Sequence, residues 1–110
     1  MPPAMRSFAD FWPHYLALHS KPRTRAIHVF GTGLGIAVFF VGLALRLWWM
    51  LPLAFVVGYF FAFLGHVLFE KNRPATLGGH AWWSFLSDMR LFWLTVTRRL
   101  GPELKRLGMA

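Results

Sequence analysis

Three histidines and one glutamate have the residue types and the spacing expected of a metal site. His66 and Glu70 are four residues apart, which places both side chains on one face of a helix. His28 lies near the start of another apolar segment, and His19 comes shortly before Pro22. The chain contains no cysteine, so imidazole and carboxylate are the available ligands, and these suit iron, zinc or manganese. The set therefore predicts a metal site of the kind found in oxygenases.

Two apolar segments must position these side chains. Residues 26–45 and 47–69 contain no charged residue, and a helix that crosses a bilayer core needs about 20 apolar residues. Hydrophobic residues make up 56% of the chain, above the roughly 45–50% of soluble domains. Two buried helices of a soluble protein are the alternative, but a chain of 110 residues is too short to cover both. We expect one domain, residues 1–110, built on a two-span helical hairpin.

The basic residues predict how this hairpin is oriented. The chain has 12 Lys and Arg residues, and all except Arg46 lie at or beyond the open end of the hairpin. The positive-inside rule then places the turn at 46–52 outside and both termini in the cytoplasm. The first span is not a signal peptide, because a second span follows it almost at once. The net charge of +8 is explained in this way, which makes nucleic acid a poor candidate partner. The predicted location is a multi-pass integral membrane protein.

The antiparallel hairpin brings the start of the first span beside the end of the second. His28 should therefore meet His66 and Glu70 at the cytoplasmic mouth. Pro22 breaks the helix between His19 and His28, so His19 can fold back over the same mouth. Small residues on each span allow the two helices to approach closely. They are Gly31, Gly35 and Gly42 on the first span, and Gly58, Ala62 and Gly65 on the second.

Short helices should flank the hairpin and complete an all-α fold. Ser7 with Asp10 resembles a capping box that opens a helix running to about residue 19. A loop at 74–80 precedes a last helix over about 82–100, which Gly101 and Pro102 should end. Asp88 and Arg90 argue against a third span. Each flanking helix is expected to lie in the membrane interface or to pack on the hairpin.

Several of these side chains also have simpler interpretations. A single histidine near an interface can be a polar residue that reaches water. The carboxylate of Glu70 can pair with Lys71, Arg73 or Arg25 instead of a metal. Ionisable groups that face the interior of a membrane bundle are costly and mark functional sites, so the group as a whole favours a site.

A second group lies on the predicted last helix. His80, Ser84 and Asp88 share one face at intervals of four residues. A hydrolase triad is disfavoured because the serine has no strained turn around it, and Ser84 near a helix start is typical of a cap. His80 and Asp88 remain candidate accessory residues of the main site.

Three segments carry a resemblance to a known family. They are residues 15–32 (YLALHSKPRTRAIHVFGT), 65–76 (GHVLFEKNRPAT) and 83–88 (WSFLSD). They resemble a small membrane family long classed as a domain of unknown function, whose characterised fungal relatives are the metabolism-of-phytosphingosine dioxygenases. The likeness covers roughly residues 8 to 95. The glycine-rich loop at 77–82 departs from the family pattern.

The resemblance implies an iron(II)-dependent dioxygenase that shortens 2-hydroxy fatty acids by one carbon, without 2-oxoglutarate. The matching metal ligands are His19, His28 and His66, and Glu70 belongs to the same motif as a catalytic residue. A chelating 2-hydroxy acid needs a cation for its carboxylate. Arg73 is the preferred one because it shares the helical face of His66, and Lys71 and Arg25 are the other candidates.

Other functions stay open at this stage. A non-enzymatic lipid-binding or assembly module would use the polar cluster for structure only. A metal-bound membrane hydrolase is a further alternative, and zinc can replace iron in purified protein. The expected partners are a lipid or fatty-acid substrate and the membrane, and self-association into a homo-oligomer is left open.

Overall fold

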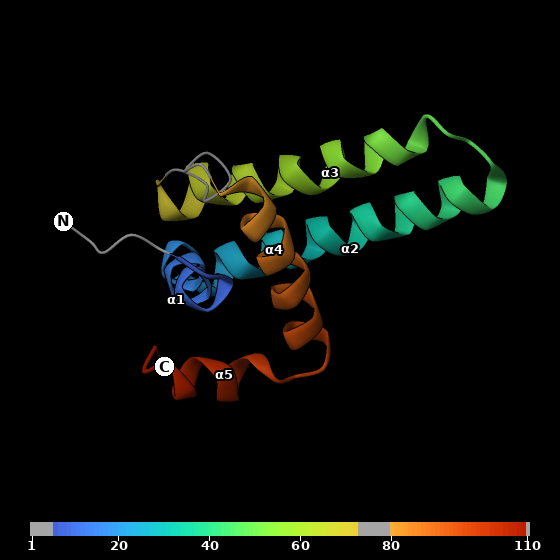
Figure 1. The fold of residues 1–110 in the computed structure, drawn as a ribbon. Helices are drawn as coiled ribbons and strands as arrows, with labels where there is room; N and C mark the ends of the chain where they lie inside the picture. The colour runs from blue at the N-terminus through green and yellow to red at the C-terminus, as the bar shows by residue number, and fades with distance from the viewer. Residues whose placement is uncertain (1–5, 73–79, 110) are drawn as a thin grey trace.

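The fold is an all-α hairpin with shorter helices gathered around its open end (Figure 1). The computed structural model describes residues 6–72 and 80–109. The two long arms are α2 (Pro22–Leu45) and α3 (Met50–Gly65), and a π-helical turn, η1 (His66–Glu70), continues the second arm. The other helices are α1 (Phe8–Leu18), α4 (Ala81–Val96) and α5 (Leu100–Arg106).

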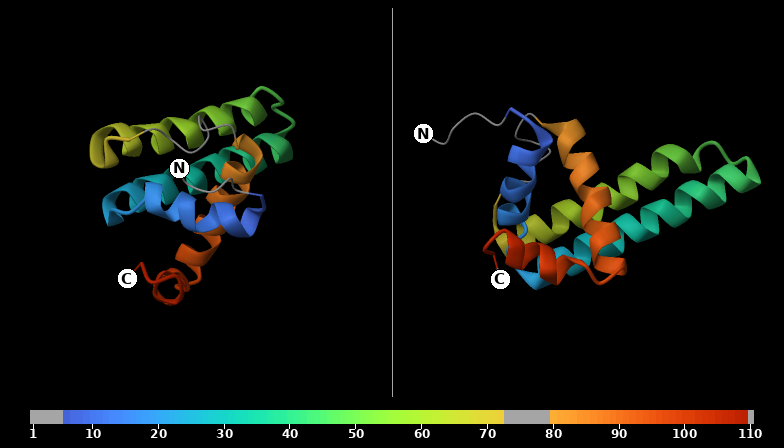
Figure 2. Two further views of the ribbon diagram at one scale, coloured as in Figure 1. Left: turned by 60° about the vertical axis from the view of Figure 1, so that its left-hand side comes forward. Right: turned by 60° about the horizontal axis from the view of Figure 1, so that its bottom comes forward.

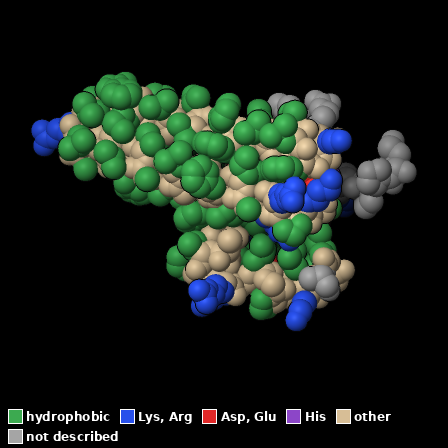
Figure 3. Space-filling view, turned by 180° about the vertical axis from the view of Figure 1, so that it is seen from behind, with side chains coloured by type: hydrophobic (Ala, Val, Ile, Leu, Met, Phe, Trp, Pro, Cys, Tyr) green, Lys and Arg blue, Asp and Glu red, His purple; other side chains and the backbone are tan. Residues whose placement is uncertain are grey.

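The two arms have the length and composition of membrane spans. Within the described residues, Pro22–Leu45 and Met50–Glu70 are long and apolar enough to cross a bilayer. Only 28% and 22% of their most apolar windows are buried inside the protein, whereas the core helices of a soluble protein are mostly buried. Figure 3 shows hydrophobic side chains covering the projecting part of the hairpin, with basic side chains towards its open end and at its tip. This surface is suited to a lipid environment.

Small residues set the distance between the arms, as expected from the sequence. A Cβ added at Gly35 would lie 2.8 Å from the carbonyl oxygen of Ala54 on the facing helix. A Cβ at Gly65 would lie 2.7 Å from Cγ2 of Ile27. The helices are therefore in close contact along this line, and an added Cβ at either position would need a neighbour to move. The turn between them is shorter than predicted, because α3 already begins at Met50.

The first helix packs inside the protein. Ser7 caps α1, and its hydroxyl accepts a hydrogen bond from the Asp10 amide at 3.3 Å. The apolar face of α1 forms the buried core with residues of α4 and α5. This core consists of Phe11, Trp12, Tyr15, Leu16, Leu91 and Leu104. This packing confirms the expectation that the helix contacts the rest of the protein.

The predicted last helix is wrong in one respect, because it is two helices. The chain leaves α4 after Val96, where Arg98 adopts a left-handed backbone conformation with φ of 59°. The hydroxyl of Thr97 bonds back to the Trp93 carbonyl oxygen at 2.7 Å. Gly101 and Pro102, expected to end the helix, instead lie in the first turn of α5, where proline costs no hydrogen bond.

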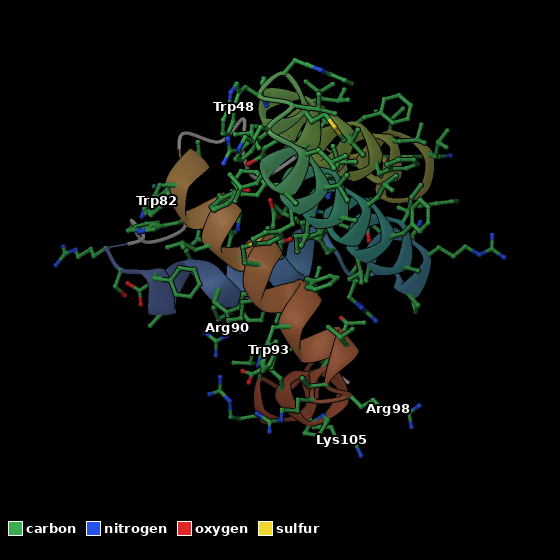
Figure 4. All side chains as sticks on the ribbon, turned by 90° about the vertical axis from the view of Figure 1, so that its right-hand side faces the viewer. Trp48, Trp82, Arg90, Trp93, Arg98 and Lys105 are labelled. Atoms are coloured by element: carbon green, nitrogen blue, oxygen red, sulfur yellow. The ribbon has the colours of Figure 1, made fainter. Side chains whose placement is uncertain are left out.

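The shorter helices lie nearer to the open end of the hairpin than to its tip (Figure 1). Helix α4 crosses the hairpin, and α5 turns back towards the same end as α1 (Figures 1 and 2). Figure 4 shows Trp82 and Trp93 pointing outwards from α4, with Arg98 and Lys105 near α5. Most of the predicted loop at 74–80 lies outside the described residues.

Candidate functional site

His19 ends α1 and is held there by its neighbours. Its Nδ1 lies 2.8 Å from the backbone oxygen of Tyr15. A carbonyl oxygen only accepts, so Nδ1 carries the proton and Nε2 keeps its lone pair. Burial, followed by the nearby His28, lowers the pKa of His19 to about 2. The imidazole is therefore neutral at physiological pH, which is the form that binds a metal.

His66 is oriented in the same way by a different partner. Its Nδ1 lies 2.6 Å from Oδ1 of Asn72. The amide of Asn72 is fixed in this direction because its Nδ2 donates to the Leu18 carbonyl oxygen at 3.2 Å. Nδ1 of His66 must then be the donor, and its Nε2 keeps the lone pair. The π-helical turn brings Asn72 back to His66, and such turns are frequent at functional sites.

The two free nitrogens face each other. Nε2 of His19 and Nε2 of His66 are 3.0 Å apart, and both rings are buried. Both atoms are acceptors, so their lone pairs repel unless a cation lies at this point. The low pKa of His19 disfavours a proton on that ring, whereas a proton on Nε2 of His66 would satisfy the pair by a hydrogen bond to His19. A metal ion that accepts both lone pairs satisfies the pair, and imidazole nitrogen suits iron or zinc.

His28 joins this cluster but has other partners. Its ring centroid is 4.9 Å from that of His19. Its Nε2 lies 3.0 Å from Oδ1 of Asp88 and 3.3 Å from the hydroxyl of Tyr15. The Tyr15 hydroxyl donates to the same Asp88 oxygen at 2.6 Å. Burial raises the pKa of Tyr15 well above its usual value, and the charge of Asp88 adds to this effect. This phenol is therefore a donor at all physiological pH values.

The structure thus brings the three predicted histidines together without a complete ligand set. Among residues 6–72 and 80–109, no three His, Cys, Asp or Glu side chains have an arrangement that would hold a metal ion. The reason lies in His28, whose Nε2 is directed at Asp88 rather than at the other two rings. Asp88, expected only as an accessory residue, is a buried member of the cluster.

Glu70 lies beside the cluster and performs a structural task. Its carboxylate accepts hydrogen bonds from the Lys21 amide at 2.6 Å and from the Ser20 hydroxyl at 3.1 Å. It therefore links the end of η1 to the start of α2. Arg25 donates to the carbonyl oxygens of His19 and Ser20, at 2.9 and 2.8 Å. Both side chains fix the turn that carries His19.

The other predicted residues lie further out. Lys71 is exposed and ends η1 in a left-handed conformation, with φ of 56°. His80 precedes α4 and stacks on Trp83, with 4.9 Å between the ring centroids. Arg73 lies outside the described residues, so its role as a carboxylate-binding residue stays a prediction.

An apolar cavity of about 240 Å³ opens beside His28 and Asp88. It lies between α2, α3 and α4, with aromatic, aliphatic and glycine residues along most of its wall. His28, Asp88, Thr32 and Tyr59 supply its polar groups. Cavities with a few convergent polar groups in an apolar wall are typical of ligand sites. This one suits an amphiphile with a polar head and a long apolar tail.

Two members of the site were missed by sequence reasoning. Tyr15 precedes His19 by one helical turn and can share its face, but its aromatic ring also suits the apolar side of the helix. Asn72 comes two residues after Glu70, beyond the apolar segment. Its pairing with His66 depends on the π-helical turn, which has no signal in a pattern based on ordinary helical periodicity.

Fold and site together define a small α-helical hairpin protein with a buried histidine cluster beside an apolar cavity. Residues 5–100 match the Mpo1-like family, described as 2-hydroxy-palmitic acid dioxygenase Mpo1-like. The chain belongs to this family, which confirms the resemblance found in the sequence. No curated protein and no solved structure matches it significantly.

Proposed function

We propose that the protein is an iron(II)-dependent dioxygenase that shortens 2-hydroxy fatty acids by one carbon. The observation that carries this proposal is the pair of Nε2 lone pairs on His19 and His66, 3.0 Å apart and buried. A cation between them would satisfy both, and a cavity suited to an amphiphile opens beside the neighbouring His28. Membership of a family whose description names a 2-hydroxy acid dioxygenase supports the same reaction.

His19 and His66 would hold the metal through Nε2, with the proton on each Nδ1 kept in place by Tyr15 and Asn72. Iron(II), when bound, supplies the electrons that activate oxygen and a centre that a 2-hydroxy acid can chelate. Glu70 and Arg25 keep His19 in position by fixing the turn between α1 and α2. These contacts would pre-organise the site.

His28 and Asp88 would bind the head of the substrate. Both line the cavity, and Asp88 as a buried carboxylate accepts a hydrogen bond from a hydroxyl group. The substrate 2-hydroxyl is such a donor, whereas an unsubstituted fatty acid has none at this carbon. Arg25, Lys71 and Arg73 are the candidate partners for the substrate carboxylate, with Arg73 preferred.

The test is product analysis under iron control. Protein in lipid nanodiscs receives iron(II), oxygen and 2-hydroxyhexadecanoic acid, and the products are identified by mass. We expect the acid one carbon shorter, with hexadecanoic acid inert because it has no 2-hydroxyl to bind iron together with a carboxylate oxygen and so cannot hold its C1–C2 bond in place. His19→Ala and His66→Ala should be inactive, whereas His14→Ala, an exposed histidine on α1, should retain activity. Equal turnover of the two acids would overturn the chelation mechanism.

A non-enzymatic lipid-binding module is the second candidate. The observation in its favour is that the described residues present no complete three-ligand set. In that case the histidine cluster would join α1, α2 and η1 as a structural element only. Fatty acid binding without metal uptake and without turnover would select this function over the dioxygenase.

A further inference from the structure

The cavity follows α2 as a groove, with the polar residues His28, Thr32 and Asp88 near one end and Tyr59 in its wall. Along α2 its lining runs from His28 to Phe40, a distance of about 18 Å at the helical rise per residue. An extended hydrocarbon chain advances roughly 1.3 Å per bond, because its bonds of about 1.5 Å meet at tetrahedral angles. The groove therefore matches an extended chain of roughly 14 bonds.

Small residues form the floor of this groove. Gly35, Ala54 and Gly58 lie where α2 and α3 are in backbone contact. Because the helices touch here, the groove has no deeper space for a chain. Gly58 differs from Gly35 in one respect: a Cβ at Gly58 would meet only the Gly31 carbonyl oxygen, at 3.8 Å. The first carbon of a side chain at this position therefore fits without displacing the facing backbone.

Aromatic rings close the end of the groove that is distant from His28. The rings of Phe39 and Phe55 meet edge to face, with 6.4 Å between their centroids. Phe55 also contacts Phe85 of α4, at 6.0 Å. All three rings line the cavity, and together they join both arms of the hairpin to α4. We call these three residues the aromatic end.

We propose that the groove binds the acyl chain of the substrate and that the aromatic end sets the chain length. The head of the chain lies at His28 and Asp88, so this inference rests on the proposed function for the identity of the head group. A saturated chain fits because the wall between the two ends offers only apolar side chains and Tyr59. A chain too long for the groove meets the rings, and a shorter one leaves apolar wall uncovered.

Two variants change the groove in opposite directions. Phe55→Ala opens the aromatic end and should shift the preferred chain to longer acids. Gly58→Leu fills the middle of the groove and should shift it to shorter acids. One methylene in a hydrophobic pocket changes selectivity by roughly 10–200-fold. The ratio of the binding affinities for octadecanoic and dodecanoic acid should therefore change at least about tenfold in each variant. Phe60→Ala is the matched control, since Phe60 is exposed on the same helix and does not line the cavity.

The experiment measures both binding and turnover for each chain length. Binding is followed by displacement of a fluorescent fatty acid from the full chain in nanodiscs, and turnover is followed with the corresponding 2-hydroxy acids. We expect opposite shifts for the two groove variants and an unchanged profile for Phe60→Ala. An unchanged profile in both folded groove variants would overturn the acyl-chain assignment, even if turnover is normal. Length-dependent binding with no turnover of any acid would support the groove and refute the dioxygenase. If Gly58→Leu does not fold, Phe55→Ala alone decides.

Discussion

At the scale of single residues, the chemistry of the site depends on where each histidine carries its proton. Tyr15 and Asn72 each accept from Nδ1 of one histidine, which leaves the two Nε2 atoms facing each other. Metal-binding histidines are commonly held in this way by a partner on the other ring nitrogen. The partners of His19 and His66 should therefore control metal affinity without touching the metal.

Asn72 allows a direct test of this control. Asn72→Leu removes the acceptor for Nδ1–H of His66, so the ring is free to change its protonated nitrogen. We predict a loss of about 10–100-fold in iron(II) or zinc affinity, measured by anaerobic calorimetry. Asn72→Asp keeps an oxygen acceptor and should retain most of the affinity. Equal affinities in Asn72→Leu and the parent would contradict this role.

The hydrogen bond between Tyr15 and Asp88 should stabilise the folded protein. Asp88 is buried, and the bond of 2.6 Å is charge-assisted. Tyr15→Phe should lower the free energy of unfolding by about 2 kcal/mol. In an Asp88→Asn background the same change should cost much less, because the charged acceptor is gone. Denaturant unfolding in micelles measures both effects. If Tyr15→Phe lowers the free energy of unfolding equally in the two backgrounds, the Tyr15 hydroxyl is not coupled to the charge of Asp88.

Sequence reasoning found the histidines at this scale but not most of their partners. Their spacing around Pro22 and along the second span was enough to place His19, His28 and His66 at one mouth. Asp88 lies 73 residues from Tyr15 in the chain, and no local pattern connects them. Glu70 shares the helical face of His66 in an ideal helix, yet the π-helical turn and the start of α2 direct its carboxylate to Ser20 and Lys21.

At the scale of elements, the hairpin depends on glycine where its helices touch. The two apolar segments, their antiparallel pairing and the small-residue lines follow from composition and periodicity. The division of the last helix does not, because Arg98 takes the left-handed conformation that glycine or asparagine usually marks. The sequence pattern does not predict the π-helical turn either.

Gly35 tests the contact between the arms. Gly35→Ala places a Cβ 2.8 Å from the Ala54 carbonyl oxygen, so the arms must separate. We predict a loss of about 1–3 kcal/mol in the free energy of unfolding. Gly58→Ala is the matched control, because its Cβ meets ordinary contacts and alanine favours the helix. A Gly35→Ala protein as stable as the control would mean that the close contact is not required.

At the scale of the whole molecule, the hairpin and the gathered helices give the protein two distinct ends. The open end carries the histidine cluster and most basic residues, and the tip carries Arg46 and the exposed Trp48 and Trp49. Tryptophan at the tip is typical of a headgroup region. We expect the tip outside and the open end in the cytoplasm.

Topology can be tested cleanly because the chain has no cysteine. Single cysteines at Trp48 and at Glu103 should react with an impermeant reagent from opposite sides of the membrane. Glu103 lies in α5, on the side expected in the cytoplasm. Labelling of both positions from the same side would refute the arrangement of two crossing helices.

The central claim is that His19 and His66 hold a metal ion between their Nε2 atoms. The most direct measurement is the metal content of protein purified without chelator and reloaded anaerobically with iron(II). We predict about one iron per chain in the parent and in His14→Ala, and its loss in His19→Ala and His66→Ala while the α-helical content is kept. Full metal content in both of these variants, or no metal in the parent, would contradict the account.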